Sequence, residues 1–347
     1  RCLLVIEDRF NPGMLASNKT YKIHHATRKE VMGSLSGRLQ RGDVIIKDGP
    51  MATYLEQKGL SNESNAWSAL ANLEHPDVVR EAHEDYIKVG ADLITTNTFP
   101  ASRLALETVG IAHRTQEVNK RAVELAIEAR DRSTSEREIA VAGSISHFLG
   151  WEQDDQGTYL TRGRANIKQL RNSLQEQAET LAESGCDLII LEMMREIETA
   201  SYALEAAVST GLPVWLGFTC RVDGDLVRLG EIPEYEDGAS FKDAVSRLLP
   251  MGASLMAVMH TVVDEALPGL EILKELWDGP LAAYQHSGHM ERPNWQTRNV
   301  FSPEEYLVEA KRWVGMGIQV IGACCGMGPE HIRLLKDRLP EQVATKS

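Results

Sequence analysis

The chain has 347 residues, 43% of them hydrophobic, and its 50 acidic and 37 basic side chains give a formal net charge of −13. This apolar content is enough for one large core or two ordinary ones. The negative charge argues against general binding to nucleic acid or to anionic membranes. No apolar run reaches the ~20 residues that a membrane-spanning helix needs. The five cysteines form no disulfide framework, so we expect a soluble, cytoplasmic protein.

Periodicity divides the chain into three parts. Residues 1–40 show no sustained pattern and are expected to be an N-terminal extension, and residues 341–347 are expected to be a C-terminal tail. Residues 41–340 alternate short apolar runs with charged segments of helical spacing. Nearly continuous apolar runs are typical of parallel strands that are covered on both faces. Eight such runs occur, at residues 44–49, 92–99, 139–146, 187–193, 213–219, 254–260, 280–286 and 320–325.

Two connecting segments carry helix signals. Residues 169–184 place apolar side chains such as Leu170 and Leu174 at helical spacing, and Gly185 follows where a left-handed residue ends a helix. Farther along, Ser302 opens a Ser-Pro-Glu-Glu sequence, which supplies an N-cap, a proline at the first helical position and a carboxylate three residues after the cap. Both segments are therefore predicted to be amphipathic helices.

Eight strands that alternate with helices favour a single-domain (β/α)8 TIM barrel over an open doubly wound sheet. A G-x-G-x-x-G sequence, which a dinucleotide-binding sheet would carry after its first strand, is absent. In such barrels the chemistry lies at the C-terminal ends of the strands. Those ends carry the candidate site residues, in chain order Asp48, Gly49, Thr96, Asn97, Ser144, His147, Glu192, Thr219, Cys220, His260, His286, His289, Cys324 and Cys325.

The sharpest local feature is the sequence Gly-Ala-Cys-Cys-Gly at residues 322–326. Successive side chains of a strand point to opposite faces, so both sulfurs can reach one metal only if the chain leaves the strand there. The flanking glycines permit this change of direction. A pair of buried thiols or a strained disulfide is the alternative. The position at a barrel mouth favours metal ligands.

Taken in order, six phrases resemble the homocysteine S-methyltransferase family, which includes betaine- and S-methylmethionine-dependent enzymes and the homocysteine module of cobalamin-dependent methionine synthase. They are KDGPMATYLEQKG (47–59), ADLITTNTF (91–99), AGSIS (142–146), GCDLIILEMM (185–194), VWLGFT (214–219) and IGACCGMGPEHI (321–332). The resemblance runs from about residue 43 to residue 335. It implies a zinc ion that is held by three cysteines and binds the homocysteine thiol.

Two of those three ligands match Cys324 and Cys325, and His260 stands where the family has its first cysteine. A neutral imidazole is a good zinc ligand, so the resemblance implies a site of His260, Cys324 and Cys325. Three other residues near the strand ends are alternatives for the first ligand: Cys220, His286 and His289.

Asp48 and Glu192 each end an apolar strand, where a buried carboxylate needs a cationic partner. The resemblance implies that both bind the α-ammonium group of homocysteine. An internal salt bridge to Lys47 or Arg195 is the alternative. Four further residues are expected close to the substrate: Gly49, Thr96, Asn97 and Ser144.

The expected function is zinc-dependent transfer of a methyl group from an onium-type donor to the thiol of homocysteine, giving methionine. The expected partners are these small molecules, and a homo-oligomer is compatible with the sequence. Met193 and Met194 stand where some family members have an aromatic residue that contacts the donor, which argues against assuming betaine. Aromatic residues that could contact an onium group are Trp67, Trp151, Tyr284 and Trp295.

Two other functions stay open at this stage. His260 in place of a cysteine would suit a family member that has lost zinc and acts as a binding or regulatory protein. A metal-dependent hydrolase on the same barrel would use histidines from the set His147, His260, His286 and His289, but the first strand carries no His-x-His pair. A measurement of bound zinc distinguishes the methyltransferase, which should contain it, from the binding or regulatory protein, which should not.

Overall fold

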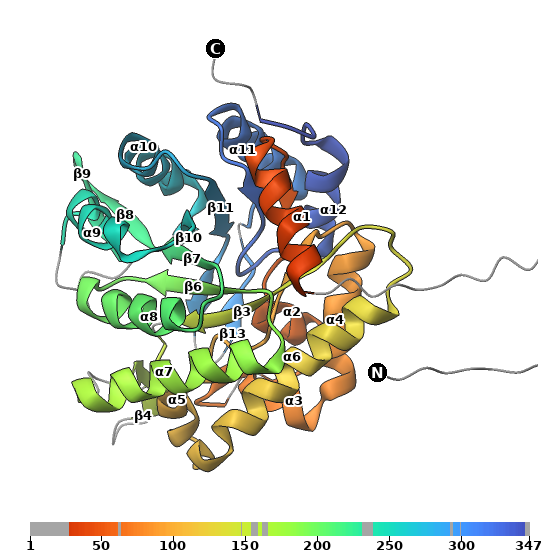
Figure 1. Ribbon diagram of the computed structural model, residues 1–347, viewed down its shortest axis with the longest axis vertical. Coiled ribbons are helices and arrows are strands. Elements are labelled where there is room, and N and C mark those ends of the chain that lie inside the picture. The colour runs from red at the N-terminus through yellow and green to blue at the C-terminus, as the bar shows by residue number, and fades with distance from the viewer. Residues whose placement is uncertain are drawn as a thin grey trace, which may run out of the picture.

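The computed structural model describes residues 28–61, 64–146, 148–153, 159–161, 166–230, 239–291, 294–298 and 300–343. Eight parallel strands form one sheet, in the order β1-β14-β11-β10-β7-β6-β3-β2, and helices surround it (Figure 1). A parallel bridge between Lys47 and Leu93 joins the two outermost strands. The sheet is therefore closed on itself, and the predicted single-domain (β/α)8 barrel is confirmed.

Each barrel strand overlaps one of the eight predicted apolar runs. The strands are β1 (Ile45–Ile46), β2 (Leu93–Thr95), β3 (Ala140–Ser146), β6 (Leu188–Met194), β7 (Val214–Phe218), β10 (Leu255–Val262), β11 (Leu281–His286) and β14 (Val320–Ile321). Three antiparallel pairs lie outside the barrel: β4 (Trp151–Gln153) with β5 (Tyr159–Thr161), β8 (Cys220–Asp223) with β9 (Leu226–Leu229), and β12 (His289–Glu291) with β13 (Asn294–Gln296).

The α-helices are α1 (Arg28–Gln40), α2 (Ala52–Gln57), α3 (Ala71–Glu74), α4 (Pro76–Lys88), α5 (Arg103–Glu107), α6 (Thr115–Arg132), α7 (Ile167–Ser184), α8 (Ile197–Ser209), α9 (Phe241–Leu248), α10 (Ala266–Leu276), α11 (Pro303–Gly315) and α12 (Pro329–Arg338). Short 3₁₀ helices are η1 (Trp67–Leu70), η2 (Ala112–Arg114), η4 (Leu249–Met251) and η5 (Val263–Glu265). Both predicted helices are confirmed. Helix α7 ends at Gly185 with φ 112°, and α11 begins with a capping box between Ser302 and Glu305.

Strand alternation separates two apolar layers. One layer fills the barrel interior and includes Ile45, Leu93 and Leu188, and the other lies between strands and helices and includes Ile46, Ile94 and Ile189. Every second side chain of a strand belongs to the same face, so a strand end inherits its orientation from the residues before it. This rule decides which polar side chains enter the barrel mouth.

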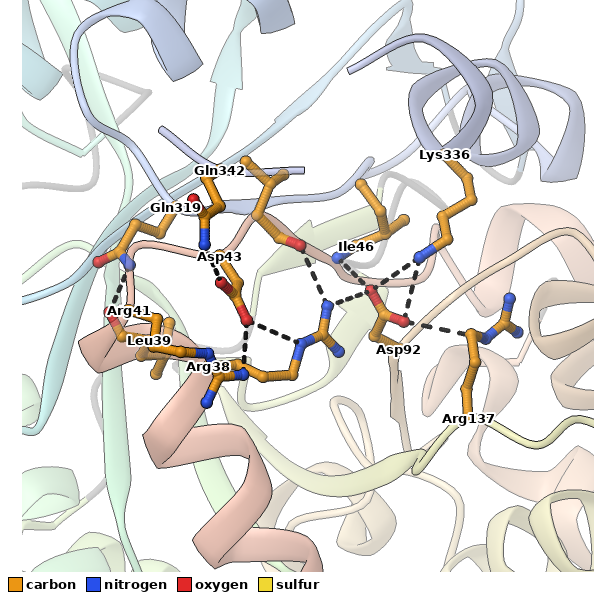
Figure 2. Close-up of polar contacts among 11 residues, drawn as sticks. Arg38, Leu39, Arg41, Asp43, Ile46, Asp92, Arg137, Gln319, Lys336 and Gln342 are labelled. Carbon is orange, nitrogen blue, oxygen red and sulfur yellow. Dashed lines mark hydrogen bonds and ion pairs between the residues drawn. The ribbon is translucent and has the colours of Figure 1, made fainter. Parts of the chain in front are cut away.

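Helix α1 covers the bottom of the barrel, at the N-terminal ends of the strands. Its Val31 and Leu35 are buried in the interior layer. Its Arg38 contacts the buried carboxylate of Asp92 at 3.2 Å, and Lys336 of α12 contacts the same carboxylate at 3.3 Å (Figure 2). Part of the expected N-terminal extension is thus packed against the barrel.

The segment after α12 also contacts the start of the barrel. Val44 donates its backbone N–H to the carbonyl of Glu341 at 2.8 Å. Figure 2 shows the neighbouring hydrogen bond between the side chains of Gln342 and Asp43. Within the part of the chain that the structure describes, no helix is long and apolar enough to cross a membrane.

Candidate active site

A cavity of about 230 Å³ opens at the C-terminal ends of the barrel strands. Residues within β6 and β10 and in the segments that follow β1, β2, β6, β11 and β14 contribute to its wall. Seven of the nine residues predicted for the site line it: Gly49, Thr96, Asn97, Glu192, His260, Cys324 and Cys325. The other two, Asp48 and Ser144, lie behind the wall and contact residues that line it.

Three of the lining residues bring soft and borderline ligand atoms together. The Nδ1 atom of His260 lies 3.4 Å from Sγ of Cys324 and 4.0 Å from Sγ of Cys325, and the two sulfurs are 3.9 Å apart. The hydrogen bond between Cys324 and Cys325, together with the adjacent His260 imidazole, holds the pKa of the Cys324 thiol well below its usual value. Three such atoms within reach of one point could hold a metal ion.

His260 reaches this cluster because its backbone leaves the strand pattern. Leu255, Ala257 and Met259 face the barrel interior, so regular alternation would turn His260 away from the mouth. Its φ of 46° is left-handed, and the pairing of β10 with β11 shifts register after Met259. A bulge of this kind re-aims a side chain. The same combination occurs at Met193, where φ is 57° and the pairing of β6 with β7 shifts.

Left-handed backbone is costly for residues that have a Cβ atom. Among the described residues other than glycine, three have it: Trp67, Met193 and His260. All three line the same cavity. Backbone strain is thus concentrated at the barrel mouth, as is common at functional sites.

Glycines on either side of the cysteines allow the chain to turn into the mouth. Gly326 has φ 83°, and a Cβ atom there would collide with the carbonyl oxygen of Ser287. A Cβ atom at Gly322 would come within 2.9 Å of the Lys47 side chain. The condition for both sulfurs to reach one metal is met, because β14 ends at Ile321, before both cysteines.

The alternative first ligands do not join the cluster. Cys220 packs in the layer between strands and helices, 3.8 Å from the Thr261 hydroxyl, and burial raises the pKa of its thiol to about 12. His289 is exposed on β12. His147 lies outside the described residues. His286 is nearby, and its ring centroid is 4.6 Å from that of His260.

His286 supports the cluster from behind. It hydrogen-bonds to the His260 backbone, and burial lowers its pKa to about 3, with a smaller effect from the charge of His260. Its ring also packs edge-on against Trp295, at 5.6 Å between centroids. A neutral, buried imidazole therefore holds the strained His260 segment in place.

Lys47 lines the cavity as well, although the sequence indicates it only as an alternative partner for a buried carboxylate. Ile45 faces the barrel interior, so alternation turns Lys47 the same way and Asp48 the opposite way. The Lys47 ammonium lies 2.9 Å from Oδ1 of Asp48 and 4.6 Å from the centroid of the Tyr284 ring, with the two charged side chains only 3% and 1% exposed. Asp48 also accepts hydrogen bonds from the backbone and hydroxyl of Thr95, at 2.6 and 3.0 Å. Of the two partners left open for Asp48, the structure contains the internal one.

Glu192 enters the cavity from β6, in line with the interior residues Leu188 and Ile190. The hydroxyl of Ser144 donates a hydrogen bond to its carboxylate. Burial raises the pKa of Glu192, and the Lys47 ammonium opposes that effect. Ser144 is therefore placed to orient Glu192 rather than to line the cavity.

A hydrogen-bonded loop after β2 forms the neighbouring wall. The Asn97 side chain accepts a hydrogen bond from the Ser68 hydroxyl at 2.8 Å and donates to Asn72 at 3.0 Å. Thr96 pairs with the hydroxyl of Thr98 at 2.7 Å. These contacts fix the loop, so its two predicted residues line the cavity in a rigid arrangement.

Four aromatic rings form part of the cavity wall. Trp67, Phe99 and Phe148 lie with ring centroids 6.0 to 6.2 Å apart, and Trp295 packs beside Trp67 and Cys325. We call Trp67, Phe99, Phe148 and Trp295 the aromatic wall. Two of its members, Phe99 and Phe148, were missed from the sequence. The side chain of Trp151, a further candidate, lies outside the described residues.

Comparisons with known proteins place this barrel in a family. A family model described as homocysteine S-methyltransferase matches residues 45–339. Betaine–homocysteine S-methyltransferase 1 of Bos taurus is 28% identical over 343 residues, which cover 90% of this chain and 77% of that protein. Homocysteine S-methyltransferase 2 of Arabidopsis thaliana is 24% identical over 322 residues, which cover 86% of this chain and 94% of that protein.

A solved structure agrees in fold. The metallated form of the homocysteine methyltransferase MmuM from Escherichia coli has a TM-score of 0.69 and 24% identity, over 88% of this chain and 99% of its own. The family model spans the barrel from the first residue of β1 to the end of α12. The chain therefore belongs to the homocysteine S-methyltransferase family.

Proposed function

We propose that this chain transfers a methyl group from an onium-type donor to the thiol of homocysteine, giving methionine, with zinc held by His260, Cys324 and Cys325. The observation that carries the proposal is the meeting of these three ligand atoms in the cavity that Glu192 and the aromatic wall also line. Family membership supplies the reaction class, and the residues of this chain supply the binding groups.

The donor set suits zinc. A tetrahedral zinc with Zn–S of about 2.3 Å and Zn–N of about 2.0 Å would separate two sulfurs by about 3.8 Å and a sulfur from a nitrogen by about 3.5 Å. The separations here are 3.9 Å between the sulfurs and 3.4 and 4.0 Å from them to the nitrogen. When bound, zinc would supply an ionised thiol at neutral pH, because coordination lowers the pKa of a thiol.

Charge balance supports Glu192 as the contact for the acceptor's ammonium group. Lys47 offsets one of the two carboxylates through its ion pair with Asp48. Glu192 lines the cavity and stays available for a cation, with Ser144 holding one of its oxygens. We therefore propose one direct contact to the ammonium group, from Glu192, with Asp48 acting by holding Lys47.

The aromatic wall suits the methyl donor. An onium cation is attracted to the faces of aromatic rings, most strongly to tryptophan. In the displacement the sulfur–carbon bond forms as the bond from carbon to the positive centre breaks, and the electron pair leaves on a neutral group. The wall also excludes water, which strengthens the electrostatic contacts of the reacting groups.

The test is metal content together with methyl transfer. Wild-type protein purified without chelator should contain about one zinc per chain and should form methionine from homocysteine. Cys325→Ser should lose both properties, and the matched control Cys186→Ser, which alters a buried thiol outside the cluster, should keep both. A wild-type protein without metal or transfer activity would favour the binding or regulatory function instead.

Two further properties remain predictions from the sequence. None of the four described cysteines forms a disulfide, which suits the reducing compartment expected for a cytoplasmic protein. A homo-oligomer is also proposed without a specific interface.

A further inference from the structure

Arg195 is a buried cation in the cavity wall that has no ion-pair partner among the described residues. It follows β6 three residues after Glu192, lines the cavity and is only 9% exposed. Its Nε atom is buried and makes no hydrogen bond. In the part of the chain that the structure describes, no carboxylate forms an ion pair with its guanidinium group.

A buried charge without a partner destabilises the folded protein, which suggests that a ligand of opposite charge binds it. Neither of the two site carboxylates, Asp48 and Glu192, forms an ion pair with Arg195 among the described residues. Asp48 is bound by Lys47 and Thr95, and Glu192 accepts a hydrogen bond from Ser144. The guanidinium therefore has free donors beside the cavity, in a planar fork that matches a carboxylate.

We propose that Arg195 binds the negatively charged carboxylate of a zwitterionic substrate, whereas Glu192 binds a positively charged ammonium group. This inference rests on the proposed function and adds to it a requirement for a carboxylate on one of the two substrates. The acceptor and the donor can each carry that group. Either substrate can therefore supply the carboxylate that Arg195 binds, and kinetic measurements identify which one does.

The experiment compares metal-loaded wild type with Arg195→Gln and Arg195→Lys. The acceptors are homocysteine and 3-mercaptopropylamine, which has the same thiol and amine but no carboxylate, and the donor is one that wild type uses. The control is Arg171→Gln, which removes an arginine that is 50% exposed and paired with Glu205 on the outer surface. Calorimetric titration with homocysteine measures binding independently of turnover.

If the acceptor supplies the carboxylate, Arg195→Gln should raise the KM for homocysteine at least tenfold and weaken its binding, and the preference over 3-mercaptopropylamine should disappear. If the donor supplies it, the KM for the donor should rise at least tenfold while homocysteine binding is unchanged. Arg195→Lys should lie between wild type and Arg195→Gln, because the charge remains and the fork is lost.

The inference is overturned if Arg195→Gln keeps both KM values and the acceptor preference within twofold of wild type. Homocysteine would still bind and be methylated in that case, so the proposed function would stand. A wild type that neither binds homocysteine nor methylates it would refute the proposed function, and this inference with it.

Discussion

Lys47→Met should lower the free energy of unfolding by about 3–5 kcal/mol at neutral pH. The substitution keeps the unbranched side chain and removes the ammonium that lies 2.9 Å from Asp48. Asp48 is then a carboxylate that is 1% exposed and has only the two hydrogen bonds from Thr95. Breaking one half of a buried pair costs this much because the remaining charge stays desolvated.

An exposed ion pair of similar length provides the control. Lys242 contacts Glu275 at 2.6 Å, but the two side chains are 50% and 60% exposed. Lys242→Met should therefore change the free energy of unfolding by less than about 1 kcal/mol. Burial, rather than distance, accounts for the expected difference between the two variants.

The loss in Lys47→Met should also depend on pH. Burial already raises the pKa of Asp48, and Lys47 opposes that rise, so removing Lys47 raises the pKa further. A carboxyl whose folded pKa exceeds its unfolded value of about 3.9 loses stability as pH increases between the two. The deficit relative to wild type should be smaller at pH 5 than at pH 7.5.

Urea unfolding at both pH values measures these differences, and adding Asp48→Asn to Lys47→Met should recover part of the loss at pH 7.5. A single variant as stable as wild type at pH 7.5 would refute the assignment of Asp48 as a buried anion that depends on Lys47. A deficit that grows toward pH 5 would refute the sign of the pKa argument.

Three more outcomes are expected. His260→Ala should lose most of its zinc in metal analysis because two protein ligands remain, whereas Cys220→Ser should keep it. Glu192→Gln should raise the KM for homocysteine or lower kcat by more than tenfold, about 1.4 kcal/mol, and Ser144→Ala should have a smaller effect in the same assay because it removes only an orienting hydrogen bond. Gly326→Ala should lower both thermal stability and zinc content, since its new methyl group collides with a backbone carbonyl; a folded, fully metallated variant would contradict that geometry.

The barrel could be predicted because its strands are nearly continuous apolar runs, a pattern that parallel strands covered on both faces produce. Helix α1 could not be separated from an extension as easily. Its buried residues Val31 and Leu35 are four apart, but the segment around them is largely polar. A single narrow apolar stripe in a short segment is a weak signal for a helix.

The site residues could be identified from the sequence because they lie at strand ends. The orientation of their side chains could not be predicted in the same way. Alternation alone would have turned His260 outward, and only the left-handed backbone brings it to the cysteines. Lys47 could have been found by counting two residues on from Ile45. The sequence indicates Arg195 only as a partner for a carboxylate of the same chain, because a sequence does not show which charged groups lack an ion pair in the fold.

The charged cluster around Asp92 (Figure 2) lies at the base of the barrel, at the end opposite the candidate active site. Closure of the barrel and the chemistry of the site therefore depend on different residues. The seam between β1 and β14 has only two residue pairs, Ile45 with Val320 and Ile46 with Ile321. Close to it, one carboxylate binds Arg38 from the start of the described chain and Lys336 from near its end. These contacts span a large sequence separation, so they form only when the barrel closes. The contacts at the base thus stabilise the closed barrel. The opposite end, which contains the strained backbone and the buried charge of Arg195, does not have to provide this stabilisation.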